Sequence, residues 1–191
     1  MDKLELKDIA PYLPYKVKVQ ITEGYYDGKF KNLSGVQYDG LLNLGKGGNF
    51  GFIEREYHQV KLLLRPMSDL TKEITHNGET FMPMLYLAGI EDRNNQYLDD
   101  DKEGEPIIGI DENDFDMGSM TYAITKRFVY DKDLKCFAID IYDEGGELEY
   151  RESFASESYE LLQVLYELHF DVNDLIGRGL AINLNEVDNE E

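Results

Sequence analysis

The segment GLLNLGKGGNFG, residues 40–51, has the glycine and lysine spacing of a phosphate-binding P-loop. A P-loop carries Ser or Thr directly after the lysine, because that hydroxyl binds the magnesium ion of the nucleotide. In this chain Lys46 is followed by Gly47. A P-loop also opens into a helix whose amino end receives the phosphates, whereas FGFIERE at 50–56 has the alternation of a strand. The sequence therefore favours a turn between two strands over a nucleotide site.

DDDKEGEPIIGI, residues 99–110, begins like the calcium loop of an EF-hand, with acids at Asp99, Asp101 and Glu103. The twelfth position of such a loop supplies a bidentate Glu, and here it is Ile110. No helical pattern flanks the segment. We therefore predict no dedicated metal site, although a metal-dependent hydrolase built from these acids remains as a third interpretation of function.

Histidine and cysteine are the other residues that could do chemistry. His58, His76 and His169 form no HxxxH or HExxH pair, and Cys136 is the single cysteine. His169 falls on the apolar side of a predicted helix, which favours a core histidine that hydrogen-bonds to the backbone or to Asp171. We predict no catalytic residues, no metal, no cofactor and no enzyme activity.

Charge is divided unevenly along the 191 residues, which hold 39 acids and 19 bases for a formal charge of −20. Residues 1–90 contain eleven acids and eleven bases, so the whole excess lies in residues 91–191. The densest stretch is 91–116, with eleven acids against Arg93 and Lys102. This surface repels nucleic acid, because such binding depends on Lys and Arg that displace counterions from phosphate. It attracts basic partners.

Two further observations bound the class of protein. The first residues, MDKLELKDIAPYLPYK, lack the apolar segment of a signal peptide, and the apolar runs of the chain are too short to span a bilayer. With 42% hydrophobic and 12% aromatic residues, the chain is too apolar to be disordered. We predict a folded cytoplasmic protein that does not enter a membrane.

The elements that must position these residues follow from periodicity and turn residues. A helix is predicted at 157–170, where a narrow polar stripe indicates that most of its surface is buried, and Asp171 is predicted to cap the turn that follows. Asn77-Gly78 predicts a hairpin with a type I′ turn. Alternating segments predict antiparallel strands, which lie at 16–22, 50–56, 59–65, 121–130 and 135–142.

We predict a single α+β domain over 1–191, formed by a curled antiparallel sheet or small β-barrel with one buried C-terminal helix. Its parts are a charge-neutral β-rich region at 1–90, an acidic loop at 91–116, a β-hairpin plus helix at 117–191, and an acidic tail at 185–191.

Three stretches resemble a known group of proteins: LELKDIAPYLPYKVKV at 4–19, KLLLRPMSDLTKEITHNGETFMPM at 61–84 and LQVLYELHFDVNDLIGRGLAINL at 162–184. They resemble short uncharacterised proteins encoded by prophages and mobile elements of Bacteroidetes-type bacteria, which carry LAPYLPY, LRPLSDLTKEI and WHFDVFGLIEKGLAI in this order. The resemblance covers about a third of the chain, with departures at Met67, Leu168 and Asn173-Asp174. It implies a phage or mobile-element origin and the cytoplasm of a host cell, and no activity that could be transferred.

We therefore predict a non-enzymatic accessory protein that binds a protein partner with a basic surface and does not bind nucleic acid directly. The oligomeric state stays open. The alternative is an inhibitor that imitates duplex DNA, which carries about one charge per 1.7 Å of axis, and blocks a nucleic-acid-binding host or defence enzyme. Aromatic residues such as Phe137 and Tyr150 interleave with the acids and belong either to this interface or to the core. The predicted partner-binding residues are Asp99, Asp100, Asp101, Glu103, Glu105, Asp111, Glu112, Asp114 and Asp116.

Overall fold

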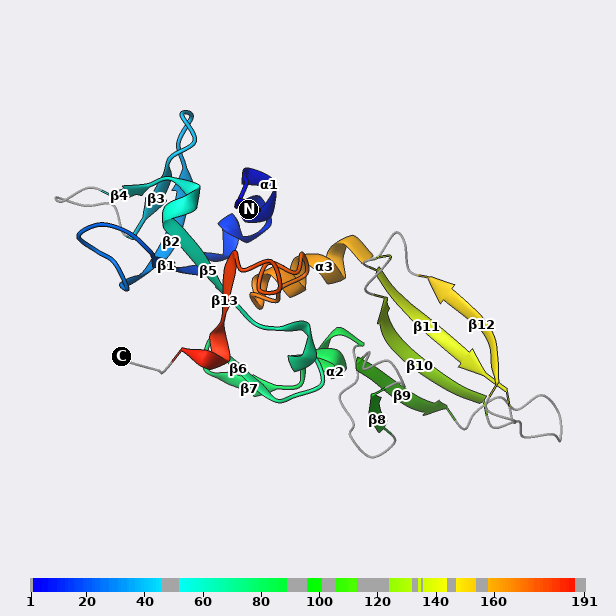
Figure 1. Ribbon diagram of the computed structural model, residues 1–191. Coiled ribbons are helices and arrows are strands. Elements are labelled where there is room, and N and C mark those ends of the chain that lie inside the picture. The colour runs from blue at the N-terminus through cyan, green and yellow to red at the C-terminus, as the bar shows by residue number, and fades with distance from the viewer. Residues whose placement is uncertain are drawn as a thin grey trace, which may run out of the picture. The chain divides into compact units, whose positions relative to one another are not determined.

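The computed structural model in Figure 1 describes residues 2–45, 52–88, 96–100, 106–112, 124–131, 134, 136–143, 147–153 and 158–187. The contacts within the chain define two compact units. Unit 1 consists of Met1–Met67 and Leu165–Glu191, and unit 2 consists of Ser68–Val164. Unit 2 is thus inserted into the sequence of unit 1. A domain is defined by independent folding rather than by contacts, so the prediction of a single domain stays a prediction.

Unit 1 contains a six-stranded sheet of order β13-β5-β1-β2-β3-β4. Neighbouring strands are antiparallel, except that β13 runs parallel to β5. β4 and β13 are the two ends of the order, so the sheet is open and does not close into a barrel. The strands are β1 (Lys18–Ile21), β2 (Phe30–Val36), β3 (Leu42–Leu44), β4 (Ile53–Arg55), β5 (Val60–Leu64) and β13 (Ala181–Asn183).

One face of this sheet forms the core of unit 1. Val19 and Leu62, which pair on the adjacent strands β1 and β5, are fully buried, and so is Leu42 on β3. Alternate residues of a strand point to the same face, so such positions can share one core. The short helix α1 (Leu6–Ile9) and the 3₁₀ turn Ala10–Tyr15 pack against it. The hydroxyl of Tyr12, which is also fully buried, donates a hydrogen bond of 2.7 Å to the carbonyl of Phe170. This bond joins the start of the chain to its end.

Unit 2 begins with a small hairpin, β6 (Ile74–His76) and β7 (Glu79–Phe81), followed by helix α2 (Pro83–Leu87). Asn77 and Gly78 join the strands with φ angles of 51° and 88°. Positive φ at both positions is what a type I′ turn requires, so the hairpin predicted from Asn-Gly is confirmed.

The main sheet of unit 2 has five antiparallel strands in the order β12-β11-β10-β9-β8. The predicted hairpin between 121–130 and 135–142 is confirmed as β10 and β11. The acidic stretch 91–116, by contrast, is not one loop, because β8 and β9 lie within it. The strands are β8 (Gln96–Asp100), β9 (Pro106–Glu112), β10 (Ile124–Asp131), β11 (Cys136–Tyr142) and β12 (Leu148–Ser153). With this open sheet and the few helices, the prediction of an α+β fold is confirmed.

Helix α3 (Ser158–Glu167) is shorter than the predicted 157–170. It ends where His169 adopts a left-handed φ of 63°, which an α-helix does not accommodate. Leu165 and Leu168 are buried, whereas the side chains of the preceding turn are only partly so. The C-terminal end of the helix is therefore the part that contributes to a core.

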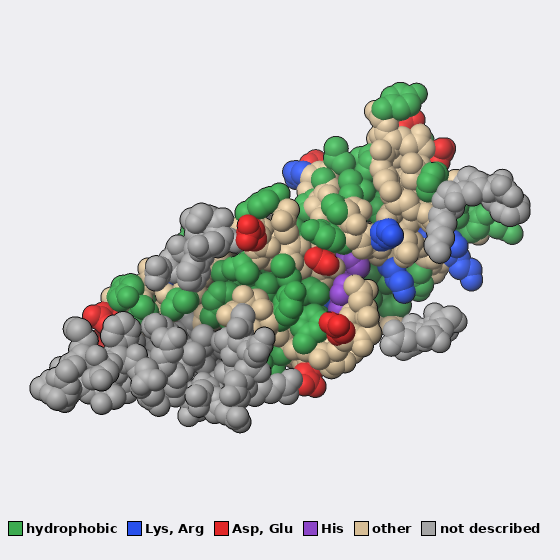
Figure 2. Space-filling view, turned by 180° about the vertical axis from the view of Figure 1, so that it is seen from behind, with side chains coloured by type: hydrophobic (Ala, Val, Ile, Leu, Met, Phe, Trp, Pro, Cys, Tyr) green, Lys and Arg blue, Asp and Glu red, His purple; other side chains and the backbone are tan. Residues whose placement is uncertain are grey.

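Among the side chains that the structure describes, most Lys and Arg belong to unit 1. Ten of the twelve Lys and Arg side chains that the structure describes lie there, and Lys72 and Arg151 are the two in unit 2. Figure 2 shows the Lys and Arg side chains of one face in blue. The two units thus differ in charge as well as in fold.

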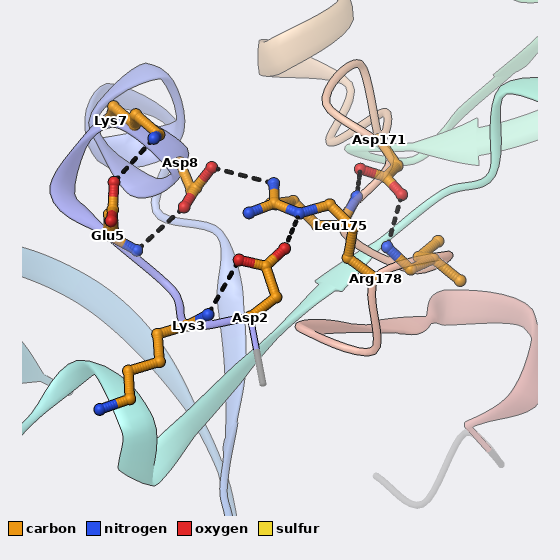
Figure 3. Close-up of polar contacts among 9 residues, drawn as sticks. Asp2, Lys3, Glu5, Lys7, Asp8, Asp171, Leu175 and Arg178 are labelled. Carbon is orange, nitrogen blue, oxygen red and sulfur yellow. Dashed lines mark hydrogen bonds and ion pairs between the residues drawn. The ribbon is translucent and has the colours of Figure 1, made fainter.

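Three carboxylates, those of Asp2, Asp8 and Asp171, bind the segment at 175–178 in unit 1, as Figure 3 shows. The guanidinium of Arg178 donates to Asp2 and, at 3.2 Å, to Asp8, whose side chain is only 4% exposed. The Asp171 carboxylate accepts the backbone N–H groups of Leu175 and Ile176, both at 2.7 Å. Asp171 therefore caps the turn at 171–176 as predicted. Arg178 binds the N-terminal segment through Asp2 and Asp8.

Replacing Arg178 with Ala should lower the free energy of unfolding by about 2 kcal/mol, because the buried Asp8 carboxylate then loses its cation. Lys7→Ala is the matched control, since its ion pair with Glu5 is exposed on both sides and such pairs contribute little to stability. Urea unfolding measures both. Equal effects of the two variants would contradict this account.

Asp171 should make the stability depend on pH. Burial raises the pKa of its carboxyl above the ordinary 3.8. A carboxyl whose pKa is raised by folding stabilises the fold fully below about pH 4, and this contribution is lost as the pH rises through the folded-state pKa. The stability of the protein relative to its Asp171→Asn variant should therefore decline from pH 3.5 to 7.

Urea unfolding of both proteins across this range tests the sign, with Asp27→Asn as a control that removes the same charge from an exposed carboxyl elsewhere in unit 1. If the protein instead gained stability relative to Asp171→Asn as the pH rose, the two N–H groups would lower the pKa of Asp171 more than burial raises it, and the prediction would be wrong.

Candidate functional site

The predicted partner-binding acids do not form one cluster along the backbone. Asp99 pairs in register with Ile107 at one end of β9, and Asp111 pairs with Thr125 near its other end. Ile107 and Asp111 are four residues apart, about 13 Å along a strand. Asp100 and Glu112 neighbour these two positions. The remaining predicted residues, Asp101, Glu103, Glu105, Asp114 and Asp116, lie outside the described residues.

The charge of unit 2 is the feature that sets it apart. Of the 39 acids and 19 bases of the chain, 24 acids and 8 bases lie between Ser68 and Val164, a formal charge of −16. Unit 1 carries the remaining 15 acids and 11 bases. However the eight bases pair, sixteen carboxylates of unit 2 have no base of the same unit to neutralise them. The excess of negative charge is therefore a property of unit 2 itself.

The described bases of unit 2 are already bound to acids outside the predicted site. Arg151 donates from Nε and Nη2 to both oxygens of Asp140, at 2.5 and 2.8 Å, and from Nη1 to Asp131 at 2.9 Å. Asp140 lies directly opposite Arg151 in the β11–β12 pair, and its side chain is 5% exposed. Its hydrogen bonds raise the pKa of Arg151. Lys72 binds the buried Asp69 at 2.8 Å.

Sequence reasoning missed a second acidic surface, which lies at the outer strand β12 and the turn before it. Asp143, Glu147 and Glu149 are exposed there. Two large apolar side chains accompany them, Leu148 at 51% and Tyr150 at 52% exposure. The alternation of Glu with Leu and Tyr in ELEY is the signal that indicates a half-exposed strand. We call these five residues, Asp143 and Glu147–Tyr150, the β12 edge patch.

The aromatic residues that interleave with the acids separate into two groups. Phe128, Tyr130 and Phe137 are buried, with the rings of Phe128 and Phe137 stacked at a centroid distance of 5.2 Å. Tyr150 is half exposed. Of the two interpretations that the sequence left open, the core therefore holds for the first three, and a place on the surface holds for Tyr150.

The structure gives the surroundings of three residues considered for catalysis. His169 Nε2 lies 3.0 Å from the backbone carbonyl of Tyr15, which confirms a histidine hydrogen-bonded to the backbone, although it follows the helix rather than belonging to it. His58 is exposed beside Glu56, at 3.3 Å. Burial, and to a lesser degree Asp131, raises the pKa of the Cys136 thiol. A raised pKa reduces the thiolate fraction on which nucleophilic reactivity depends.

The two motif-like segments are flanked by strands. In the P-loop-like segment, Leu42–Leu44 form β3 and the next described element is β4, not a helix. The EF-hand-like segment begins at the end of β8 and continues into β9. Both observations agree with the turn and non-EF-hand interpretations of these segments.

Among the described residues, no group of three or more His, Cys, Asp or Glu side chains is placed to hold a metal ion. None of the helices in the described part of the chain combines the length and apolarity needed to cross a bilayer. Comparison with protein-family models, with curated proteins and with solved structures found no match to this chain.

Removing the cation of the β11–β12 pair should destabilise unit 2. Arg151→Met leaves the buried Asp140 carboxylate without its partner, and we expect a loss of about 3 kcal/mol in the free energy of unfolding. Adding Asp140→Asn to this variant should recover most of the lost free energy of unfolding, because no unpaired charge then remains buried. Urea unfolding of both variants checks this, and a double variant as unstable as Arg151→Met would contradict it.

Proposed function

We propose that the protein is a non-enzymatic accessory protein that binds a basic surface of another protein through its acidic unit 2. The observation that carries the proposal is the imbalance of 24 acids against 8 bases in that unit. A field of this size attracts cationic surfaces and accelerates their association, and it weakens as salt is added. The same field opposes direct binding of nucleic acid.

The described side chains support this proposal in two ways. Arg151 and Lys72 bind Asp140, Asp131 and Asp69, so neither offsets the exposed acids of the β12 edge patch. Exposed Leu148 and Tyr150 lie among those acids and would supply the apolar contact that charge alone lacks. The resemblance to prophage and mobile-element proteins supports action in the cytoplasm of a bacterial host.

The proposal is tested by capture of partners from lysate of such a host, with the protein immobilised and bound proteins identified by mass spectrometry. Asp99→Lys/Asp100→Lys/Asp101→Lys should reduce capture of a specific basic protein at least tenfold, and rising salt should elute it. The control, Glu23→Lys/Asp27→Lys/Glu186→Lys, reverses three exposed acids of unit 1 and should leave capture unchanged. Capture that is insensitive to salt, or that both variants reduce equally, would contradict the proposal.

The same material separates the two alternatives. A captured DNA-binding enzyme that duplex DNA displaces would favour the DNA-mimic inhibitor over an ordinary protein partner. A thermal shift with calcium, magnesium or manganese that Asp99→Lys/Asp100→Lys/Asp101→Lys abolishes would favour the metal-dependent hydrolase.

A further inference from the structure

We infer that the outer edge of β12 is a docking element of unit 2 in addition to the predicted acids at 99–116, and that it takes an extended basic segment of the partner as a sixth strand of the sheet. This inference rests on the proposed function and adds to it a location and a binding mode.

The outer edge of β12 is open in the described part of the chain. β12 ends the order of its sheet and pairs only with β11 among the described strands. A strand has two edges, and the N–H and C=O groups on the second edge of β12 have no partner strand among the described residues. Glu147, Leu148, Glu149, Tyr150 and Arg151 are all exposed. An extended segment can therefore reach this backbone.

β12 lacks two of the devices by which proteins protect such edges. Lys and Pro are common there, because one repels a second strand and the other cannot pair with it. The sequence of β12, LEYRES, contains neither. Its one base, Arg151, is bound by two carboxylates and so adds no net positive charge to the edge.

A third protective device, a β-bulge, is present in β12, but it leaves the rest of the strand regular enough for another strand to pair with it. The register shifts between Tyr142↔Leu148 and Ile141↔Tyr150, which makes Glu149 the extra residue. From Tyr150 to Ser153 the pairing with β11 is regular. Four residues are enough for a short added strand, since strands of 3–10 residues are usual.

Charge decides which segment fits this edge. Asp143, Glu147 and Glu149 favour Lys or Arg in the incoming strand, and Leu148 and Tyr150 favour residues with apolar side chains or stems. A second copy of this chain would bring acids against acids, and like charges directly across a strand pair are destabilising. A basic extended segment is therefore the occupant, bound by the strand addition that many peptide-recognition proteins use.

The probe is an eight-residue peptide of alternating Lys and Val, titrated into the full chain and followed by fluorescence anisotropy. Its control has the same sequence and charge but carries N-methyl groups on two neighbouring central residues, so that one lies on each edge of the peptide strand. Strand addition requires those N–H groups, and we expect the methylated peptide to bind at least tenfold more weakly. We also expect the unmodified peptide alone to slow hydrogen exchange of the backbone amides of Leu148–Ser153.

Matched protein variants locate the site. Glu147→Lys/Glu149→Lys reverses two acids of the β12 edge patch, and Glu79→Lys/Glu160→Lys reverses two exposed acids elsewhere in unit 2. Both change the charge of the unit equally. The first pair of substitutions should weaken binding of the unmodified peptide at least tenfold, and the second pair less than threefold.

The outcomes separate this inference from the proposed function. If both peptides bind equally and both variant pairs weaken binding alike, unit 2 attracts basic chains by charge alone and the inference is overturned while the proposed function stands. If neither peptide binds at low salt, both fail. Protection of β12 amides without peptide, together with a dimer in sedimentation, would assign the edge to a second copy and overturn the inference.

Discussion

Unit 2 contains three acidic residues for each basic one, and this imbalance limits how the unit can be built. A cation is scarce there, and the two that the structure describes, Lys72 and Arg151, are bound to acids whose side chains are almost wholly buried. Burying Asp69 or Asp140 without a partner would cost more than leaving a surface carboxylate unpaired. The two described cations are therefore used to pair buried carboxylates, whereas the described acids of the β12 edge patch stay exposed.

The same allocation links stability to the proposed binding. Because Arg151 is held by Asp140 and Asp131, it contributes to the packing of β10, β11 and β12 rather than to the potential outside. Arg151 therefore does not offset the exposed acids Glu147 and Glu149 at the start of β12. Half-exposed Leu148 and Tyr150 give that chain an apolar surface as well. Unit 1 uses its arginine differently, since Arg178 holds Asp2 and Asp8 at the opposite end of the sequence.

Features fixed by a few neighbouring residues were predictable from the sequence. Asn77-Gly78 specifies its hairpin through the φ angles of two residues, and Asp171 caps a turn only four residues away. Features that depend on distant residues were not predictable. Periodicity predicted that the helix continues past Glu167. The contact of His169 with Tyr15 joins positions 154 apart, so the local sequence pattern does not reveal it. The acidic composition of 91–116 suggested a loop, yet β9 is paired on both sides by β8 and β10. The charge distribution along the sequence pointed to the C-terminal half, but only the three-dimensional contacts of the chain show that most of the excess belongs to an inserted unit.

The local electrostatic potential is the most direct test of this account. It can be measured residue by residue from the NMR relaxation that cationic and anionic paramagnetic cosolutes cause at backbone amides. We expect a markedly more negative potential at the amides of the β11–β12 turn and β12 than at those of β1, β2 and β5 in unit 1. Equal potentials over the two units would contradict the claim that unit 2 presents an unneutralised negative surface.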